Sequence, residues 1–111
     1  NKMIQACSFL IFNKDFTSFS KSHTQNYTNN CNIFFASWFE EQGALVFRIK
    51  ADRFLRNMVR AIVGTMIMIG EGKIEPQQME NIINSKDRSS AGFSVPAHAL
   101  FLLKVEYPKI N

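Results

Sequence analysis

The sequence has little of what secreted, metal-binding or membrane-spanning proteins require. It contains two cysteines, Cys7 and Cys31, and no apolar run approaches the ~18 residues of a membrane span. No cationic and apolar leader is present, so we expect a cytoplasmic protein without membrane attachment whose thiols are reduced. A disulfide between the two cysteines is the less favoured alternative. His98 has no cysteine or carboxylate neighbours at ligand spacing, so we interpret it as structural and expect no metal site.

The composition is that of a small globular domain. Hydrophobic residues make up 46% of the 111 residues, too many for a disordered chain, and 11 of them are phenylalanine. The length corresponds to about one domain, so we treat 1–111 as a single unit. A surplus of 13 lysines and arginines over 9 acidic residues gives a net charge of +4. This charge attracts polyanions effectively only where it is clustered.

Apolar periodicity divides the chain into six elements. The expected order is a helix over 1–12, strands over 31–39 and 44–50, a long helix from Asp52 to about Ile69, a short helix after Pro76 and a strand over 100–107. This order indicates an α+β fold in which helices pack on one face of an antiparallel sheet. The first helix is already under way at Asn1 without an initiator methionine, so we interpret the chain as a fragment. Within the polar stretch 13–30, we expect Phe16 and Phe19 to anchor the segment in the core, and base stacking is the less favoured alternative.

Both expected strands carry apolar side chains, but the distribution differs. In 31–39, alternation places Ile33, Phe35 and Phe39 on one face and Phe34, Ala36 and Trp38 on the other. Since both faces are apolar, this strand requires cover from a helix on one side and from a partner domain on the other. In 44–50, the residues expected to face inward are Leu45, Phe47 and Ile49. Arg48 and Lys50 then lie on the outer face, and Gly43 supplies a positive φ in the turn between the strands.

The expected long helix carries three arginines on an otherwise apolar surface. At about 100° per residue, these polar residues and one glycine share a face: Arg53, Arg56, Asn57, Arg60 and Gly64. Glycine costs about 1 kcal/mol against alanine inside a helix, so we expect another group to approach closely over Arg60, with Gly64 leaving the space for it. Two interpretations of the arginine face stay open. It is either a solvated basic surface or an anion site, because arginine favours bidentate contacts to carboxylate and phosphate.

Four stretches of the sequence carry a resemblance to a known family. Residues 54–65, Phe-Leu-Arg-Asn-Met-Val-Arg-Ala-Ile-Val-Gly-Thr, are similar to the signature of the tRNA pseudouridine synthase A family. Three further stretches agree in the family's order: 15–19, 87–92, and 96–102 followed by 105–108. One such match would be weak, but four in register span nearly the whole chain. The chain therefore resembles the C-terminal half of such an enzyme.

The resemblance implies a fold, a reaction and a set of partners. It implies the C-terminal half of the pseudouridine synthase fold, in an enzyme that isomerises uridine to pseudouridine in the anticodon stem-loop of tRNA. The family uses no metal or organic cofactor and is dimeric. The expected partners are therefore tRNA, the N-terminal half of the same enzyme and a second copy. The nucleophilic Asp belongs to an Arg-Thr-Asp-Ala-Gly-like segment of the N-terminal half, which this chain lacks. We therefore expect the fragment to be inactive alone.

Two residues acquire roles from the resemblance. Arg60 falls on the arginine that pairs with the nucleophilic Asp, where a guanidinium keeps the carboxylate ionised and oriented. Leu100 falls on an apolar pocket residue, against which an extruded base would lie. Candidate contacts to the tRNA backbone are the following cations and one amide: Arg53, Arg56, Asn57, Lys14, Lys21, Arg48 and Lys50. Each of these is also compatible with an ordinary surface position.

A non-enzymatic module is the alternative function. An RNA-binding domain with an exposed sheet would use the same basic residues, although the sequence has no Lys-Gly-Phe-Gly-Phe-like signature of the commonest RNA-binding module. A dimerisation domain would use the two-sided, phenylalanine-rich strand. This second role is compatible with the enzyme hypothesis.

Overall fold

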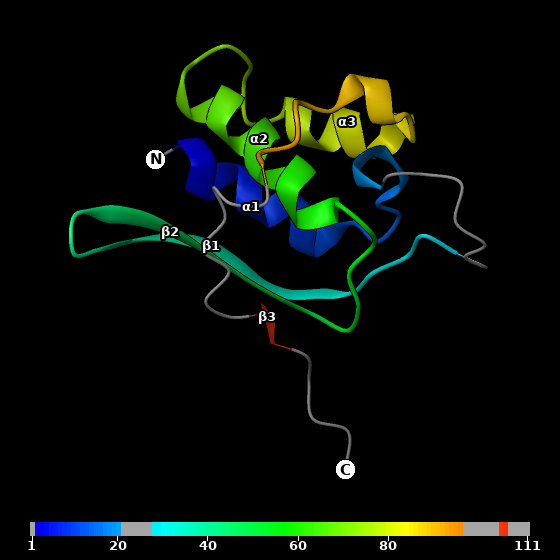
Figure 1. The fold of residues 1–111 in the computed structure, drawn as a ribbon. Coiled ribbons are helices and arrows are strands. Elements are labelled where there is room, and N and C mark those ends of the chain that lie inside the picture. Colours follow the sequence, from blue (N-terminus) through cyan, green and yellow to red (C-terminus); the bar gives the residue numbers. More distant parts are fainter. Residues whose placement is uncertain (1, 21–27, 97–104, 107–111) are drawn as a thin grey trace.

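The computed structural model describes residues 2–20, 28–96 and 105–106, and in this part helices lie on one face of a β-sheet (Figure 1). The elements are α1 (Lys2–Phe12), β1 (Ile33–Glu41), β2 (Ala44–Ala51), α2 (Met58–Gly70), α3 (Gln78–Ser85) and β3 (Val105–Glu106), with short 3₁₀ turns η1 (Thr17–Phe19) and η2 (Arg88–Ser90). β1 and β2 form an antiparallel hairpin, and β3 joins β2 in parallel. The expected α+β fold with helices on one face is confirmed, but the sheet is antiparallel only between β1 and β2, since β3 pairs in parallel. Of the strand expected over 100–107, only 105–106 lie within the described residues.

The hairpin turn lies at Gln42 and Gly43, whose φ angles are 52° and 79°. The positive φ expected at Gly43 is confirmed, and glycine adopts it without a steric penalty. The tip of the hairpin extends beyond the helices (Figure 1), and this explains an incorrect prediction for Leu45. Leu45 was expected to face inward, but it is 58% exposed because it lies close to the turn, where no helix covers it. Ile49, nearer the middle of the sheet, is buried as predicted.

A β-bulge near the start of β1 changes which side chains are covered. The pairing register shifts between Ile33 and Phe35. A bulge inserts one extra residue and interrupts the alternation of side chains, so the faces predicted for the first residues of this strand are wrong. Ile33 is buried, like Ala36 and Trp38, whereas Phe34 is 55% exposed. One face of β1 is therefore covered by helices, and its other aromatic side chains stay accessible.

The helices and the hairpin share one hydrophobic core. α1 matches the first expected helix, packs on β1 and buries Met3, Ala6, Cys7 and Leu10. α3 buries the stripe predicted for the short helix: Met79, Ile82 and Ile83. Phe16 and Phe19 are fully buried, so they anchor the polar segment in the core as expected. Cys7 and Cys31 are buried free thiols, in agreement with the favoured interpretation. Among the described helices, none is long and apolar enough to cross a membrane.

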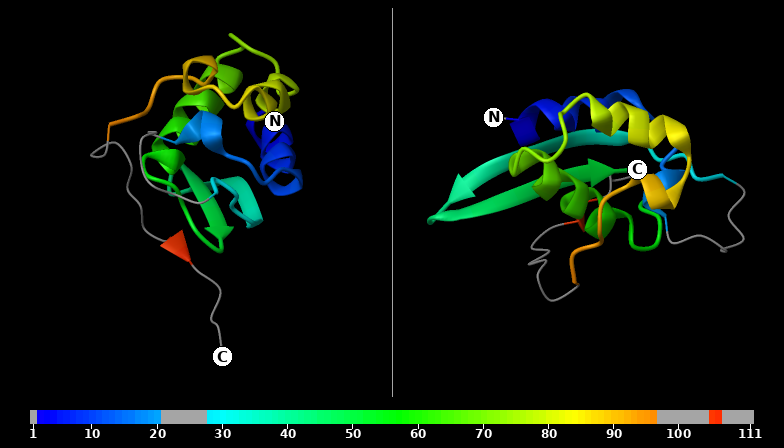
Figure 2. Two further views of the ribbon diagram at one scale, coloured as in Figure 1. Left: turned by 90° about the vertical axis from the view of Figure 1, so that its right-hand side faces the viewer. Right: turned by 90° about the horizontal axis from the view of Figure 1, so that it is seen from above.

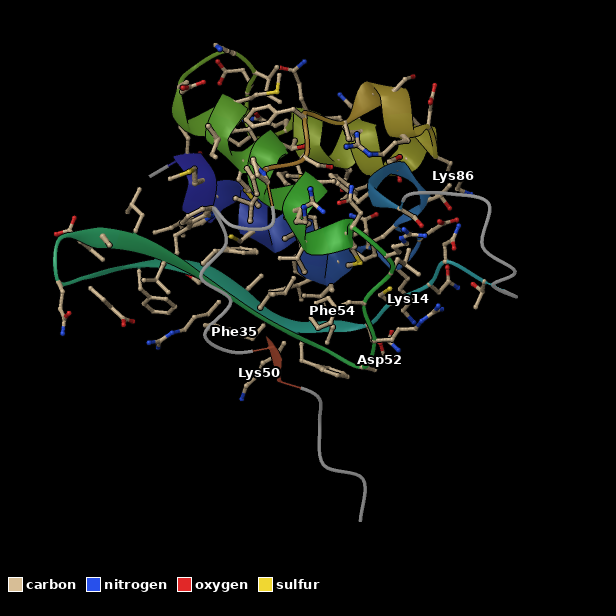
Figure 3. All side chains as sticks on the ribbon, viewed as in Figure 1. Lys14, Phe35, Lys50, Asp52, Phe54 and Lys86 are labelled. Carbon is tan, nitrogen blue, oxygen red and sulfur yellow. The ribbon has the colours of Figure 1, made fainter. Side chains whose placement is uncertain are left out.

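α2 begins later than predicted, and Asp52 is not its N-cap. The Asp52 carboxylate accepts hydrogen bonds from the Asn32 amide at 2.8 Å and from Asn32 Nδ2 at 2.7 Å, so it closes the end of the hairpin (Figure 3). The chain then enters the helix through Asn57, whose φ of 68° lies in the left-handed region that asparagine tolerates better than most residues. Arg53 and Arg56 therefore precede the helix. The predicted stripe of three arginines along one helix is wrong.

Candidate functional site

Residues 91–96, called the strap below, run along α2 in the opposite direction (Figure 1, orange). At one end, the Gly92 amide donates to Thr65 Oγ1 at 2.8 Å. At the other end, the Val95 amide donates to the Arg60 carbonyl oxygen at 3.1 Å. Two further views show the same proximity of the strap and α2 (Figure 2). The segment that follows η2 is thus fixed to α2 between Arg60 and Thr65, although the two are far apart in sequence.

Gly64 allows this close contact between the strap and the helix. A Cβ atom at Gly64 would lie 1.6 Å from the carbonyl oxygen of Phe93 and 2.7 Å from its carbonyl carbon. Because the obstacle is backbone, no side-chain rotation relieves the clash. A close approach along this face was predicted over Arg60, and the approaching group is the backbone of the strap, which meets Gly64 at Phe93 and Arg60 at Val95.

Arg60 lies in the first turn of α2 and is half-buried beside the strap. Its Nε donates to the Val95 carbonyl oxygen at 2.7 Å, while its own carbonyl oxygen accepts from the Val95 amide. Both the backbone and the side chain of Arg60 are therefore held by one residue of the strap. A guanidinium has five N–H donors, and for Arg60 only Nε has a hydrogen-bond acceptor among the described residues. Within the described ranges, Arg60 forms no ion pair with a carboxylate.

Ser94 receives two hydrogen bonds that fix the middle of the strap. Its Oγ accepts from Asn57 Nδ2 at 2.6 Å and from Arg88 Nη2 at 2.7 Å. Arg88 Nη1 also donates to the Gly92 carbonyl oxygen at 3.0 Å. Asn57, a predicted RNA contact, thus uses its amide nitrogen within the chain. The guanidinium of Arg88 binds two positions of the strap at once.

Arg88 lies in the 3₁₀ turn η2, and Asp87 caps this turn. The Asp87 carboxylate accepts from the Ser89 hydroxyl at 2.7 Å and from the Ser89 amide at 2.9 Å, and these hydrogen bonds hold its pKa below the ordinary value. The Asp87 amide donates to Oγ of Ser18, which is fully buried and donates to a carbonyl oxygen of α3 at 2.6 Å. The sequence pattern did not single out Arg88 as a site residue. Its position in the Asp-Arg-Ser-Ser motif was the available signal, but a motif does not show which acceptors its arginine reaches.

The candidate RNA contacts near the start of α2 differ in how they are engaged. Arg53 Nη1 donates to the carbonyl oxygens of Thr28 and Asn30 at 2.8 and 3.3 Å, which fixes it to the polar segment. Arg56 is exposed, and none of the described residues contacts its guanidinium through a hydrogen bond or ion pair. The side chain of Lys14 is also exposed (Figure 3). Arg56 and Lys14 are therefore the more accessible cations of this region.

Two candidate contacts, Arg48 and Lys50, lie on β2. Arg48 forms an ion pair with Glu41, and its guanidinium lies 5.0 Å from the centre of the Phe39 ring. Lys50 is exposed on the side of the sheet away from the helices (Figure 3). Two predicted site residues lie outside the described residues: Lys21 and Leu100. In the part of the chain that the structure describes, no three His, Cys, Asp or Glu side chains form a group that would hold a metal ion.

The helix and the strap both lie within a match to a known family. A profile of the family described as tRNA pseudouridine synthase matches residues 6–108, which include α2, η2 and the strap. The chain belongs to the tRNA pseudouridine synthase family. This membership confirms the resemblance carried by the arginine-containing signature in residues 54–65.

Three curated relatives, each named tRNA pseudouridine synthase A, illustrate the match. The protein of Parabacteroides distasonis is 55% identical over 107 residues, which cover 96% of this chain and 42% of the relative. The protein of Porphyromonas gingivalis is 54% identical, with 96% of this chain and 43% of the relative covered. The Clostridium acetobutylicum protein is 41% identical, with 95% and 43% covered. The chain spans about two fifths of the length of these curated relatives, and it corresponds to their C-terminal part.

Proposed function

We propose that the intact protein isomerises uridine to pseudouridine in the anticodon stem-loop of tRNA, and that this chain supplies Arg60 to its active site. The observation that carries the proposal is the environment of Arg60. Val95 binds its backbone and its Nε, while the Nη edge forms no ion pair among the described residues. A half-buried guanidinium held in this way is suited to a carboxylate from another part of the protein. Family membership and the shared name of the relatives support the reaction.

The proposed partner of Arg60 is the nucleophilic Asp of the N-terminal half. A carboxylate in a water-poor cleft tends to gain a proton, and an adjacent guanidinium lowers its pKa and keeps it ionised. The planar fork of the arginine also orients the carboxylate for its covalent step. Leu100 is proposed to form the apolar surface on which the extruded uracil lies. No cofactor is needed for this division of roles.

We further propose that the tRNA backbone is bound by cations on the accessible surface. Arg56 and Lys14 are the strongest candidates in the described part, because their charges are exposed and make no ion pair there. Arg53 and Arg48 are engaged with other groups of the chain, so they contribute to binding mainly through their long-range charge. Lys50 and Lys21 are proposed as additional contacts.

The proposed protein partners are the N-terminal half of the enzyme and a second copy, in the cytoplasm. The outer face of β1 supports a protein partner, because Phe34, Phe35 and Phe39 are 55%, 40% and 36% exposed. Phe35 and Phe39 stack with their ring centroids 6.1 Å apart, so they form a continuous aromatic surface. Exposed apolar surface of this kind is typical of interaction sites. This docking role is compatible with the enzyme function.

The central test is pseudouridine formation by the intact protein on an unmodified tRNA transcript, with Arg60→Ala and Arg60→Lys as variants. We expect both variants to lose product formation while their Kd for tRNA stays within about twofold of the wild type, because Arg60 acts on a carboxylate rather than on phosphate. Lys cannot replace the arginine, since it lacks the Nε donor that binds Val95 and the planar fork.

Lys73→Ala is the matched control, because it removes an exposed cation whose ion pair, among the described residues, is with exposed Glu71 at 3.3 Å. We expect it to be fully active. Normal turnover in Arg60→Ala would refute the assigned role of this residue. An upstream segment without an Arg-Thr-Asp-like motif, or measurable isomerisation by the chain 1–111 alone, would show that the nucleophile has been misplaced.

A further inference from the structure

We propose that Arg88 is a positioning residue for Arg60, which it orients through the strap without touching the reacting groups. This inference rests on the proposed function, since it assigns a second arginine to the same site. The carbonyl oxygen of Val95 is the acceptor that fixes Nε of Arg60, at 2.7 Å. The direction in which the Nη edge points therefore depends on where the strap places that oxygen.

Arg88 fixes the strap through both ends of its fork. Nη1 donates to the Gly92 carbonyl oxygen at 3.0 Å, and Nη2 donates to Ser94 Oγ at 2.7 Å. These acceptors lie two residues apart on the strap, and a planar guanidinium spans them without internal rearrangement. A lysine ammonium presents a single point charge and cannot hold both acceptors in this geometry. The fork thus fixes the strap immediately before Val95.

Two contacts, one from the residue before α2 and one from the helix, complete the clamp on the strap. Asn57, directly before the helix, donates to the same Ser94 Oγ at 2.6 Å. Thr65 Oγ1 accepts from the Gly92 amide at 2.8 Å. The strap is therefore held from the η2 side by Arg88 and from the helix side by Asn57 and Thr65.

The turn η2, which carries Arg88, is hydrogen-bonded to a buried residue of the core. Asp87 caps η2, and its amide donates at 3.1 Å to Ser18 Oγ, which is fully buried. Among the described residues, no carboxylate forms an ion pair with Arg88. Its guanidinium donates to neutral acceptors of the strap. This is consistent with a residue that fixes the strap and thereby orients Arg60.

The test uses the intact enzyme and compares Arg88→Ala, Arg88→Lys and the double variant Arg60→Ala with Arg88→Ala. We expect Arg88→Ala to lower kcat about 10- to 100-fold while KM for tRNA changes by less than about twofold. Arg88→Lys should be equally impaired, because the charge is kept and the fork is lost. In the Arg60→Ala background, Arg88→Ala should cause no further loss, since the two residues act as one unit.

The pH profile separates positioning from a merely structural effect. A displaced guanidinium lowers the pKa of the catalytic carboxylate less. The acidic limb of kcat for Arg88→Ala should therefore move to higher pH. Cys7→Ala, which leaves a cavity at a buried position of α1, is the control for general destabilisation and should leave the limb in place. If Arg88→Ala fails to fold, Ser94→Ala removes the shared acceptor and should show a smaller shift in the same direction.

Several results would overturn the inference. These are full kcat in Arg88→Lys, an unchanged acidic limb in Arg88→Ala, or additive losses in the double variant. A rise in KM alone would mean that Arg88 contacts tRNA directly. If the wild-type enzyme forms no pseudouridine, the proposed function fails together with this inference. If the wild type is active, Arg60→Ala is inactive and Arg88→Ala is normal, the inference alone fails.

Discussion

Replacement of Gly64 by alanine perturbs the contact between the strap and α2 with a single methyl group. The new Cβ would lie 1.6 Å from the Phe93 carbonyl oxygen, whereas real Cβ contacts shorter than 3.0 Å essentially do not occur. The neighbour is backbone, so the strap must retreat until this distance is relieved. Since Val95 follows Phe93 by two residues, the acceptor for the Arg60 side chain has to move with it.

The size of the effect follows from the bonds that this movement breaks. Two join Val95 to Arg60, at 2.7 and 3.1 Å, and one joins Gly92 to Thr65, at 2.8 Å. At about 0.5–1.5 kcal/mol per bond, their loss costs about 1.5–4.5 kcal/mol, and the better helix propensity of alanine returns about 1 kcal/mol. We expect the free energy of unfolding to fall by roughly 2 kcal/mol. A misplaced Arg60 should lower the rate of pseudouridine formation about 100-fold.

The assay combines urea unfolding of the intact protein with single-turnover product formation on tRNA. Gly70→Ala is the matched control in the same helix. Its Cβ would meet Met3 Sδ at 2.9 Å, the flexible end of a side chain that can move aside. We therefore expect Gly70→Ala to be active and close to the wild type in stability. A Gly64→Ala protein with unchanged stability and rate would refute the view that strap placement controls Arg60.

Two further predictions concern the chemistry of single groups. Burial raises the pKa of Asp52, but hydrogen bonds from the amide and side chain of Asn32 outweigh it and hold the pKa below its ordinary value of 3.8. The folded state thus binds this proton less readily than the unfolded state, so stability present above about pH 4 is lost as the pH falls through the folded pKa. The urea midpoint of the intact wild type should exceed that of Asp52→Asn at about pH 6 and converge with it towards about pH 3; a constant difference would contradict this. Burial also raises the pKa of the Cys7 and Cys31 thiols to about 12 and about 11, so neither should react with iodoacetamide at about pH 8 until urea unfolds the protein. Peptide mass spectrometry measures the labelling, and rapid modification of native protein would show that these thiols are accessible.

Most elements could be predicted from the sequence because their signals are local. The apolar spacing of α1 and the stripe of α3 each repeat over more than one turn, so periodicity alone places them. Gly43 in the hairpin turn is a similar case, since a positive φ favours glycine. The residues whose positions were predicted incorrectly have a different property in common. Their conformation depends on partners that are distant in sequence.

Asp52 illustrates this dependence. Before an apolar helical pattern, an aspartate is a good N-cap. Across the hairpin, however, the amide and side chain of Asn32 offer the same carboxylate two donors, at 2.8 and 2.7 Å. The carboxylate is bound by Asn32 and does not cap the helix, which starts after Asn57. Of the arginines that a helical wheel places on one face, Arg53 and Arg56 therefore precede the helix and Arg60 lies within it. Helical periodicity cannot show where the helix begins, because the analysis already assumes that all of these residues are helical.

The site shows the same limit at the level of function. The family signature identifies Arg60 by its neighbours in sequence, but the group that orients its side chain, Val95, lies 35 residues away. The signature thus singles out Arg60 but not the strap that holds its side chain. If orientation decides the rate, substitutions in the strap and at Arg88 should lower turnover, though less than those at Arg60. Arg53 and Arg56, outside this contact, should affect tRNA affinity more than turnover. The ratio of kcat to KM effects across these positions therefore separates the residues that aim the guanidinium from those that only add positive charge.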